Sequence, residues 1–209
     1  SDTLWSLRGS PREVAVLGGG PIACELAQAM AELGLKVTLV GRNKRLLPRE
    51  DASVGDVVLN ALQSSGVRVL LNAQAMSAER EGAQQRLWVQ HGGETETIHF
   101  DFLLLAIGRT ARTKGFGLET LDIPLTAQGT VATNEYLQTR YPNIYACGDV
   151  VGPYQFTHVA AHQAWYAAVN GLFGLFKRFK ADYRVIPAVT FTHPEVARVG
   201  LNQQEARAQ

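Results

Sequence analysis

Cysteine is scarce in this sequence: Cys24 and Cys147 are the two present, and they lie far apart along the chain. So few cysteines exclude a disulfide framework and a Cys-x-x-Cys zinc or redox motif within the chain, and they suit a reducing compartment. We therefore expect a cytoplasmic protein. Both cysteines are interpreted as buried small hydrophobic residues.

An excess of one charge sign is also missing, and so is a long apolar run. The net charge is +1, so we expect no broad basic surface for nucleic acid or a membrane. Residues 160–176 come closest to a membrane span, but His162, Gln163 and Asn170 interrupt them and they fall short of the ~18 apolar residues required. The start, Ser1-Asp2-Thr3-Leu4, has no basic region followed by an apolar core, so no signal peptide is expected.

A glycine motif stands between an apolar run and an amphipathic helix pattern. The run Glu13–Leu17 leads into Gly18-Gly19-Gly20-Pro21-Ile22-Ala23, the helix pattern ends at Gly34, and a second strand follows at Lys36–Val40. This context predicts a Rossmann-type unit. Gly18 allows the tight turn, Gly20 lets the backbone approach a pyrophosphate, and the helix N-terminus stabilises its charge.

The rest of the chain predicts an α/β fold with an inserted β-meander. After the second strand we expect a helix at residues 51–65, capped by Asp51, and then a strand at 67–71. Three short strands at 75–81, 86–91 and 94–100 are separated by turns at Glu81-Gly82 and Gly92-Gly93. Further elements are expected as a short helical turn at 4–7, strands at 101–107, 143–147 and 185–192, and a long helix at 157–176.

Several motifs occur together in one order: Leu47-Pro48-Arg49-Glu50-Asp51, Leu104-Leu105-Ala106-Ile107-Gly108-Arg109, Asn143-Ile144-Tyr145-Ala146-Cys147-Gly148-Asp149 and Phe191-Thr192-His193-Pro194-Glu195-Val196. With the glycine motif, they resemble the flavin-dependent pyridine nucleotide–disulfide oxidoreductases, such as glutathione reductase, dihydrolipoamide dehydrogenase and mercuric reductase. The resemblance implies a three-layer Rossmann-type NAD(P)-binding domain with a β-meander at 1–112. It also implies a second FAD-domain segment at 113–183 and the start of an interface domain at 184–209.

The resemblance also implies parts that this sequence does not contain. Family members carry an N-terminal flavin lobe with a Cys-x-x-x-x-Cys disulfide, and a C-terminal interface domain with a His and a Glu. We therefore expect this chain to be a central piece of a homodimeric protein, with that lobe and that domain as its partners. We expect no catalytic residue in it and no activity from it alone.

The loop after the second strand bears on the choice of nucleotide. NAD-binding units place an acidic residue about 20 positions past the glycines, on the ribose. Here Gly41 stands instead, followed by Arg42, Asn43, Lys44 and Arg45. A guanidinium grips a 2′-phosphate that a carboxylate would repel, so NADPH is favoured over NADH. The alternative is a solvated basic surface loop.

Further cofactor-binding positions follow from the resemblance. Glu25 matches a glutamate near the nicotinamide; alternatively it is an ordinary acid in the first helical turn. Pro21 replaces a frequent aromatic residue, which puts an aromatic gate in doubt. Arg109 is expected beside the nucleotide and Asp149 at the ribityl chain of FAD. The expected set also includes Gly18, Gly20, Ile22, Ile107, Gly108, Gly148, Phe156, Thr157 and His158.

No metal site is expected. His158 and His162 are spaced one helical turn apart, but no third ligand accompanies them. The leading hypothesis is an enzyme that passes hydride from NADPH through FAD to a disulfide or a soft metal ion. Two alternatives stay open: an NADH-linked dihydrolipoamide dehydrogenase, and a nucleotide-binding module without turnover.

Overall fold

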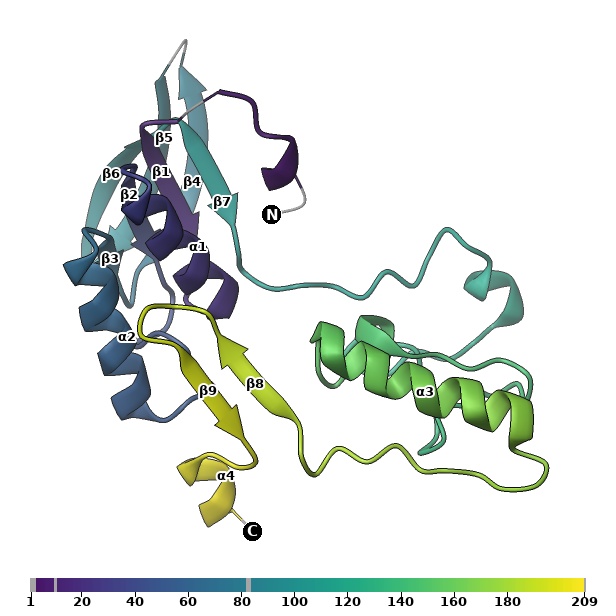
Figure 1. Ribbon diagram of the computed structural model, residues 1–209. Helices are drawn as coiled ribbons and strands as arrows, with labels where there is room; N and C mark the ends of the chain where they lie inside the picture. Colours follow the sequence, from purple (N-terminus) through teal and green to yellow (C-terminus); the bar gives the residue numbers. More distant parts are fainter. Residues whose placement is uncertain (1–2, 10, 82–83, 209) are drawn as a thin grey trace. The chain divides into compact units, whose positions relative to one another are not determined.

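The computed structural model describes residues 3–9, 11–81 and 84–208, and the chain divides into two compact units (Figure 1). The first unit comprises Ser1–Gly108 and Pro187–Gln209, and the second comprises Arg109–Ile186. Each unit is described by itself.

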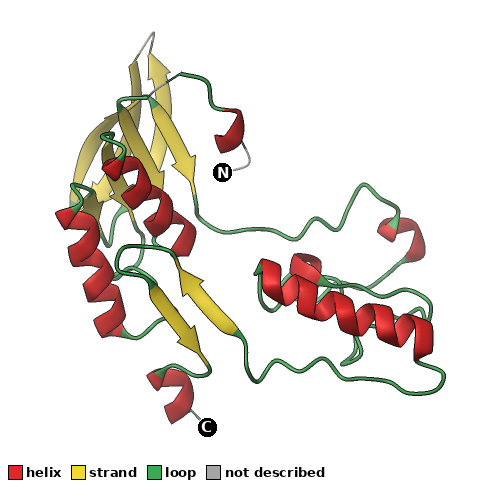
Figure 2. Cartoon of the chain, viewed as in Figure 1, coloured by secondary structure: helices red, strands yellow, loops and turns green. Residues whose placement is uncertain are grey.

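The first unit is built on a parallel sheet (Figure 2). Its strands are β1 (Glu13–Leu17), β2 (Lys36–Val40), β3 (Arg68–Leu70) and β7 (Phe102–Leu105), in the order β3-β2-β1-β7. The helices α1 (Pro21–Glu32) and α2 (Ala52–Ser64) connect the first three strands. A parallel connection needs such a crossover because the chain must return to the starting edge. The predicted Rossmann-type fold class is confirmed.

Alternate residues of the sheet enter two different cores. Val14 and Val16 of β1 pack with the apolar faces of α1 and α2. Ala15, between them, packs on the opposite face with Leu87 and Val89 of the meander. Successive side chains of a strand point to opposite faces, so this sheet is covered on both sides. The first unit therefore has the predicted three layers: helices, parallel sheet and β-meander.

The meander has three antiparallel strands, β4 (Gln74–Glu81), β5 (Gln84–His91) and β6 (Glu94–Phe100). The turn expected at Gly92-Gly93 is present, and both glycines have positive φ (63° and 89°). The turn expected at Glu81-Gly82 falls partly on residues 82–83, which lie outside the described part of the chain.

The C-terminal segment forms a hairpin on the first unit. The strand expected at residues 185–192 is shorter, β8 (Pro187–Thr190), and it pairs with a strand that the sequence did not predict, β9 (Val196–Val199). Val196 packs against the core between sheet and helices, and a short helix, α4 (Gln203–Arg207), follows.

The second unit has one long helix, α3 (Thr157–Phe173), with short 3₁₀ turns η2 (Leu118–Leu121) and η3 (Gly148–Val150). A further 3₁₀ turn, η1 (Leu4–Ser6), stands at the expected place in the first unit. The long helix ends three residues before the expected Phe176, because Gly174 forms its C-cap and glycine disfavours helix continuation.

Two local predictions were wrong. The segment expected as a strand at 143–147 forms a single bridge, between Tyr145 and Gln138. Its neighbour is a turn in which Leu137 has a φ of +63°, so no extended partner is available for a ladder. Asp51 is the N-cap residue of α2 but makes no capping hydrogen bond. Its carboxylate instead accepts the backbone N–H of Gln203 at 3.0 Å.

Truncation of the helix-side core should destabilise the first unit. Leu39 in β2 is fully buried between the sheet and the helices. We expect Leu39→Ala to lower the free energy of unfolding by about 2–5 kcal/mol, since the cavity forfeits both transfer energy and packing. Leu33→Ala is the control, because Leu33 is 79% exposed and its truncation should change stability by less than about 0.5 kcal/mol. Urea unfolding followed by circular dichroism measures both; equal effects would contradict the assigned core.

Candidate functional site

Three predicted groups of residues meet at one edge of the parallel sheet. The glycine motif follows β1, the basic loop 41–45 follows β2, and Ile107-Gly108 follows β7. The carboxyl ends of parallel strands share an edge, and ligands of open α/β sheets bind outside that edge. Arg109, which the sequence groups with Gly108, begins the second unit.

The glycine loop leaves no room at Gly18 and open space at Gly20. Gly18 has a φ of +138°, and a Cβ there would lie 2.4 Å from the carbonyl oxygen of Ala106. Its N–H donates to the carbonyl of Val40 at 2.9 Å, which joins the ends of β1 and β2. No atom lies within 4 Å of a Cβ built on Gly20. The first glycine therefore serves packing, and the second leaves the backbone accessible from outside.

Helix α1 begins directly after Gly20, with Pro21 at its first position. Proline suits this position because its fixed φ is helical and its missing N–H has no partner there anyway. The next two amides, of Ile22 and Ala23, have no acceptor within the helix, so the partial positive charge of the helix N-terminus lies beside the glycine loop.

Cys24 is confirmed as a buried hydrophobic residue, but Cys147 is only half-buried, so the same prediction was wrong for Cys147. The side chain of Cys24 is fully buried. Burial, and secondarily the charge of Glu25, raises the pKa of the Cys24 thiol to about 12. The thiolate is the reactive form of cysteine, so Cys24 is chemically inert at neutral pH.

Glu25 contacts the C-terminal segment. Its carboxylate accepts the backbone N–H of Phe191 at 2.8 Å. One turn later Gln28, which is buried, accepts the N–H of His193 at 2.7 Å and donates to its carbonyl at 2.9 Å. Glu25 lies beyond the first turn of α1, so its interpretation as a first-turn acid is wrong. Its expected place near a nicotinamide stays a prediction.

The basic loop has a fixed backbone and exposed side chains. Gly41 donates to the carbonyl of Leu70 at 2.8 Å and accepts from Ala73 at 3.0 Å. The carbonyl of Asn43 accepts from Asn72, also at 3.0 Å. The side chains of Arg42, Asn43 and Lys44 are exposed, and within the described residues neither Arg42 nor Lys44 forms an ion pair. Arg45, half-buried, donates to the carbonyl of Pro48 at 3.3 Å.

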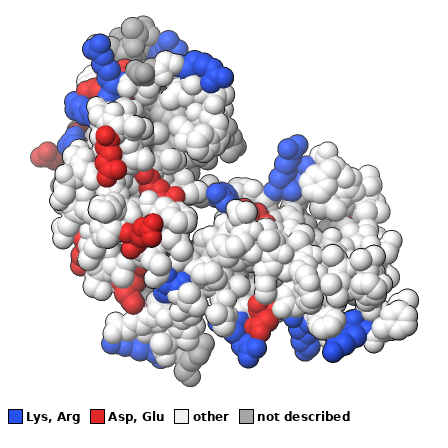
Figure 3. Space-filling model, in the orientation of Figure 1, with Lys and Arg blue, Asp and Glu red and all other residues white. Residues whose placement is uncertain are grey.

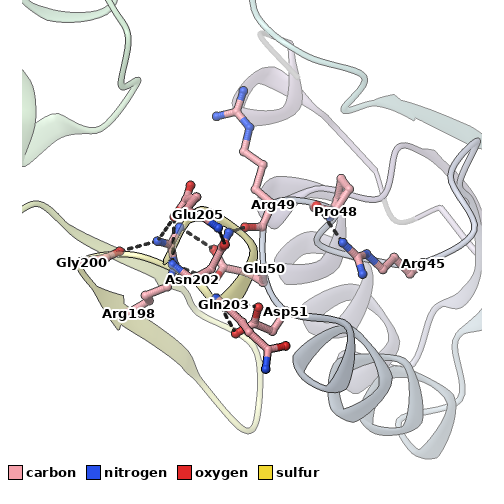
Figure 4. A network of polar contacts seen from close by, with 10 residues as sticks. All are labelled: Arg45, Pro48, Arg49, Glu50, Asp51, Arg198, Gly200, Asn202, Gln203 and Glu205. Atoms are coloured by element: carbon pink, nitrogen blue, oxygen red, sulfur yellow. Dashed lines mark hydrogen bonds and ion pairs between the residues drawn. The ribbon is translucent and has the colours of Figure 1, made fainter. Parts of the chain in front are cut away.

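A polar network continues from this loop to the C-terminal segment (Figure 4). The guanidinium of Arg198 donates to both carboxylate oxygens of Glu50, at 2.8 and 3.4 Å. Asn202 donates to the carbonyl of Arg49 at 2.8 Å and forms a capping box with Glu205. Arg198 and Asn202 were not predicted from the sequence, since nothing in their local pattern indicates a contact about 150 residues away.

In the second unit, Arg109 and Asp149 come together as an ion pair. Nη1 of Arg109 lies 3.2 Å from Oδ2 of Asp149, and both side chains are about half exposed (50% and 46%). The sequence predicted a ligand-binding role for each residue but not their contact. An exposed pair of this kind contributes little to stability, so a ligand group can replace or join it at small cost.

Gln163 stabilises the turn that contains Asp149 by hydrogen bonds. Its fully buried amide accepts the N–H of Gly148 at 2.6 Å, and donates to the carbonyl of Gly152 and to the hydroxyl of Tyr183, both at 2.9 Å. Gly148 has a φ of +80°, and a Cβ there would lie 3.3 Å from the Cβ of Ala160. In the sequence Gln163 interrupts an apolar run and was not predicted to have this role. Its helical spacing from Val159 was the available signal that both residues share the buried face.

The N-terminus of α3 carries the last predicted group. Phe156 is its N-cap without a side-chain capping bond, and Thr157 and His158 are exposed in the first turn. The rings of Phe156 and His158 stack at 5.3 Å with an interplanar angle of 10°. His162, one turn on, contacts the carbonyl of Asp182 through Nε2 at 2.7 Å. Within the described residues, no group of three or more His, Cys, Asp or Glu side chains is arranged to hold a metal ion.

The sequence profile of the pyridine nucleotide-disulphide oxidoreductases matches residues 1–164. The chain belongs to this family. Among curated members, it is 38% identical to a mercuric reductase of Staphylococcus aureus, over 99% of this chain and 38% of that protein. It is 37% identical to a dihydrolipoyl dehydrogenase of Chlamydia pneumoniae, over all of this chain and 44% of that protein.

A solved member of the oxidoreductase family has the same fold. The HOCl-induced flavoprotein disulfide reductase RclA from Escherichia coli superposes with a TM-score of 0.86 at 29% identity, covering 99% of this chain and 46% of that chain. The chain thus spans less than half the length of these relatives.

Removal of the Gln163 amide should loosen the Asp149 turn. In Gln163→Leu the N–H of Gly148 and the carbonyl of Gly152 lose their partner, and each buried unpaired group costs roughly 1–3 kcal/mol. We expect lower stability in urea and faster hydrogen exchange at the Gly148 amide. Gln128→Leu, at an exposed position of the same unit, is the control. Unchanged exchange at Gly148 would show that Gln163 does not hold the turn.

Proposed function

We propose that this chain is the nucleotide-binding part, and a segment of the flavin-binding part, of an NADPH-dependent oxidoreductase. The observation that carries the proposal is the basic loop after β2, where Arg42 and Lys44 stand exposed on a fixed backbone and Gly41 occupies the place of the usual acid. Family membership supports the use of a pyridine nucleotide and FAD.

The nucleotide-binding residues proposed here fit a dinucleotide. The open space at Gly20 and the amides of the first turn of α1 suit a pyrophosphate, because the backbone is accessible there and the helix N-terminus is positive. Ile22 and Glu25 belong to α1, which begins just after β1, and Ile107 and Gly108 follow β7, so we assign them to the same nucleotide site. In this proposal Arg42, Lys44 and Arg45 distinguish the 2′-phosphate from a hydroxyl.

The second unit fits the ribityl and ring portions of a flavin. We propose that Asp149 accepts a ribityl hydroxyl, that Arg109 lies beside the nucleotide, and that the N-terminus of α3, at Phe156, Thr157 and His158, stabilises negative charge on the ring. When bound, FAD supplies the two-electron chemistry between NADPH and the substrate. The chain's own residues bind and orient it, and Gly148 with Gln163 holds the turn in place.

The substrate proposed for the whole protein is a disulfide or a soft metal ion. Relatives named mercuric reductase and dihydrolipoyl dehydrogenase support these two classes. In this proposal the whole protein is a cytoplasmic homodimer with an N-terminal flavin lobe and a C-terminal interface domain. Within the present chain, residues 1–112 bind NAD(P), residues 113–183 belong to the FAD domain, and residues 184–209 begin the interface domain. An NADH-linked dihydrolipoamide dehydrogenase and a non-catalytic nucleotide-binding module remain the alternatives.

The chain should prefer NADPH to NADH, and Arg42 should carry most of the preference. A hydrogen bond to a charged group contributes about 1.5–3 kcal/mol, which is about 10- to 100-fold in affinity. We expect Arg42→Ala to weaken NADPH binding by that factor and to leave NADH nearly unchanged. Lys36→Ala is the matched control, because Lys36 lies at the opposite end of β2. Calorimetry with both nucleotides measures the preference. Equal binding of NADPH and NADH by the unmodified chain would refute the assignment of NADPH.

The double variant Gly41→Glu/Arg42→Ala should move the preference toward NADH. The new carboxylate accepts from the 2′-hydroxyl and repels the 2′-phosphate. A Cβ at position 41 would lie 3.2 Å from Cδ2 of Leu71, so only the end of a flexible side chain must shift. Continued preference for NADPH in this variant would place the discriminating contacts elsewhere.

The 209-residue chain should bind nucleotide without turnover. Cys24 and Cys147 are its two cysteines, and Cys24 is buried with a raised pKa, so no reactive cysteine pair is available to reduce a disulfide. With added FAD and a disulfide, we expect the rate of NADPH oxidation to stay roughly at background. The rate is measured as the loss of nucleotide absorbance at 340 nm. Steady turnover would require a different catalytic group and would overturn this part of the proposal.

A further inference from the structure

The charge on the first unit is mixed in sign. Acidic and basic side chains are interspersed over the face that Figure 3 shows, and the net charge of the whole chain is +1. No helix in the described part of the chain is long and apolar enough to cross a membrane. Charges more than about 10 Å apart are screened in solution, so the binding of an anion to this unit depends on which neighbouring charges are already paired.

Glu50 places a carboxylate close to the basic loop. Arg45 and Glu50 line one surface cavity at the start of α2. Arg45 donates to the carbonyl of Pro48 at 3.3 Å, but within the described residues it forms no ion pair with Glu50. An unpaired carboxylate in this place would compete for the cations of the loop and would repel a bound phosphate.

Arg198 of β9 neutralises this carboxylate from the C-terminal hairpin. Its Nε donates to Oε2 of Glu50 at 2.8 Å, and its Nη2 lies 3.4 Å from Oε1 (Figure 4). Hydrogen bonding to Glu50, and secondarily the nearby charges of Glu205 and Asp51, raises the pKa of the guanidinium. A two-point contact between guanidinium and carboxylate also fixes the direction in which Glu50 points.

The neighbouring carboxylates have backbone partners of their own. Asp51 accepts the N–H of Gln203 at 3.0 Å, and Glu205 accepts the N–H of Asn202 at 2.8 Å. Both bonds would remain without Arg198, although Glu205 also lies 3.2 Å from it. Among the described residues, Arg198 supplies the printed side-chain partners of Glu50, so its loss would leave Glu50 as the carboxylate without compensation.

We propose that Arg198 is a positioning residue for NADPH specificity, because it keeps the Glu50 carboxylate paired and away from Arg45 and the 2′-phosphate. This inference rests on the proposed NADPH function and adds the C-terminal hairpin to the determinants of the nucleotide site. Without Arg198, the charge of Glu50 either occupies a cation of the basic loop or faces the phosphate. Both effects oppose NADPH, whereas NADH carries a neutral hydroxyl at that position and is little affected.

Calorimetry with NADPH and NADH tests the inference in the 209-residue chain. Arg198→Met should weaken NADPH binding by about 5- to 10-fold and change NADH binding by less than about 2-fold, since the unpaired carboxylate acts on a charged group within the screening length. The loss of NADPH affinity should shrink as salt rises. A merely structural role of Arg198 would affect both nucleotides and would not depend on salt in this way.

Two further variants separate the charge of Glu50 from the bond that ties the hairpin to the loop. Arg198→Met/Glu50→Gln lacks both the ion pair and the negative charge, so it should restore NADPH binding to within about 2-fold of the unmodified chain. Glu50→Gln alone leaves the positive charge of Arg198 in place and should tighten NADPH binding by about 2- to 5-fold. This single variant keeps the inference testable if Arg198→Met does not fold, which urea midpoints reveal.

Arg68→Met is the matched control. It also removes one positive charge from an ion pair of the first unit, with Glu96, but Arg68 begins β3 and so lies at the sheet edge opposite to the basic loop. It should leave the binding of both nucleotides unchanged.

The possible failures are distinguishable. Unchanged NADPH preference in Arg198→Met, a double variant as weak as Arg198→Met, or weaker NADPH binding in Glu50→Gln would each overturn the inference and leave the assignment of NADPH intact. Equal binding of NADPH and NADH by the unmodified chain would overturn the assignment of NADPH, and this inference with it.

Discussion

The first unit depends on the close approach of β1 to β7 at Gly18. A side chain there would meet the carbonyl oxygen of Ala106 at 2.4 Å, and the φ of +138° is one that other residues rarely adopt. The same residue donates to Val40, so β1 ends in contact with both neighbouring strands. This constraint places the turn from β1 into α1 at the centre of the sheet. The helix N-terminus, the basic loop and the end of β7 share one edge, because the strands that precede them run parallel.

The second unit is held by a different interaction, the bidentate bonding of buried side-chain amides to backbone. In the described part of this unit no regular strand is present, so its loops lack ladder partners. Gln163 and Asn170 on α3 satisfy backbone groups of four separate loop positions instead. A buried unpaired peptide group costs more than a hydrogen bond gains, so these two amides decide which loop conformations are allowed.

Local sequence patterns predicted those features of the fold that depend on neighbouring residues alone. Apolar periodicity identified β1, α1 and β2, because buried faces must be apolar, and the glycines marked turns that need positive φ. Asp51 shows the limit: its identity suggests a helix cap, but its carboxylate bonds Gln203, far along the chain. Gln163, Asn170, Arg198 and Asn202 were missed for the same reason. A polar side chain does not reveal its partner until tertiary contacts bring that partner near.

The contacts around the basic loop bear on the anion-binding role proposed for it. Leu46 and Leu47 are buried directly after it, and a Cβ on Gly55 of α2 would come within 2.8 Å of the carbonyl of Leu46. Glu50 and Arg198 form an ion pair that is largely shielded from solvent, with side chains 14% and 25% exposed, so it is screened less than the surface pairs. The chain that follows the loop is thus packed against α2 at Leu46 and paired with the C-terminal hairpin at Glu50. In the nucleotide complex proposed above, the cost of holding a phosphate falls mainly on the side chains of Arg42 and Lys44, because the loop backbone is already fixed by hydrogen bonds.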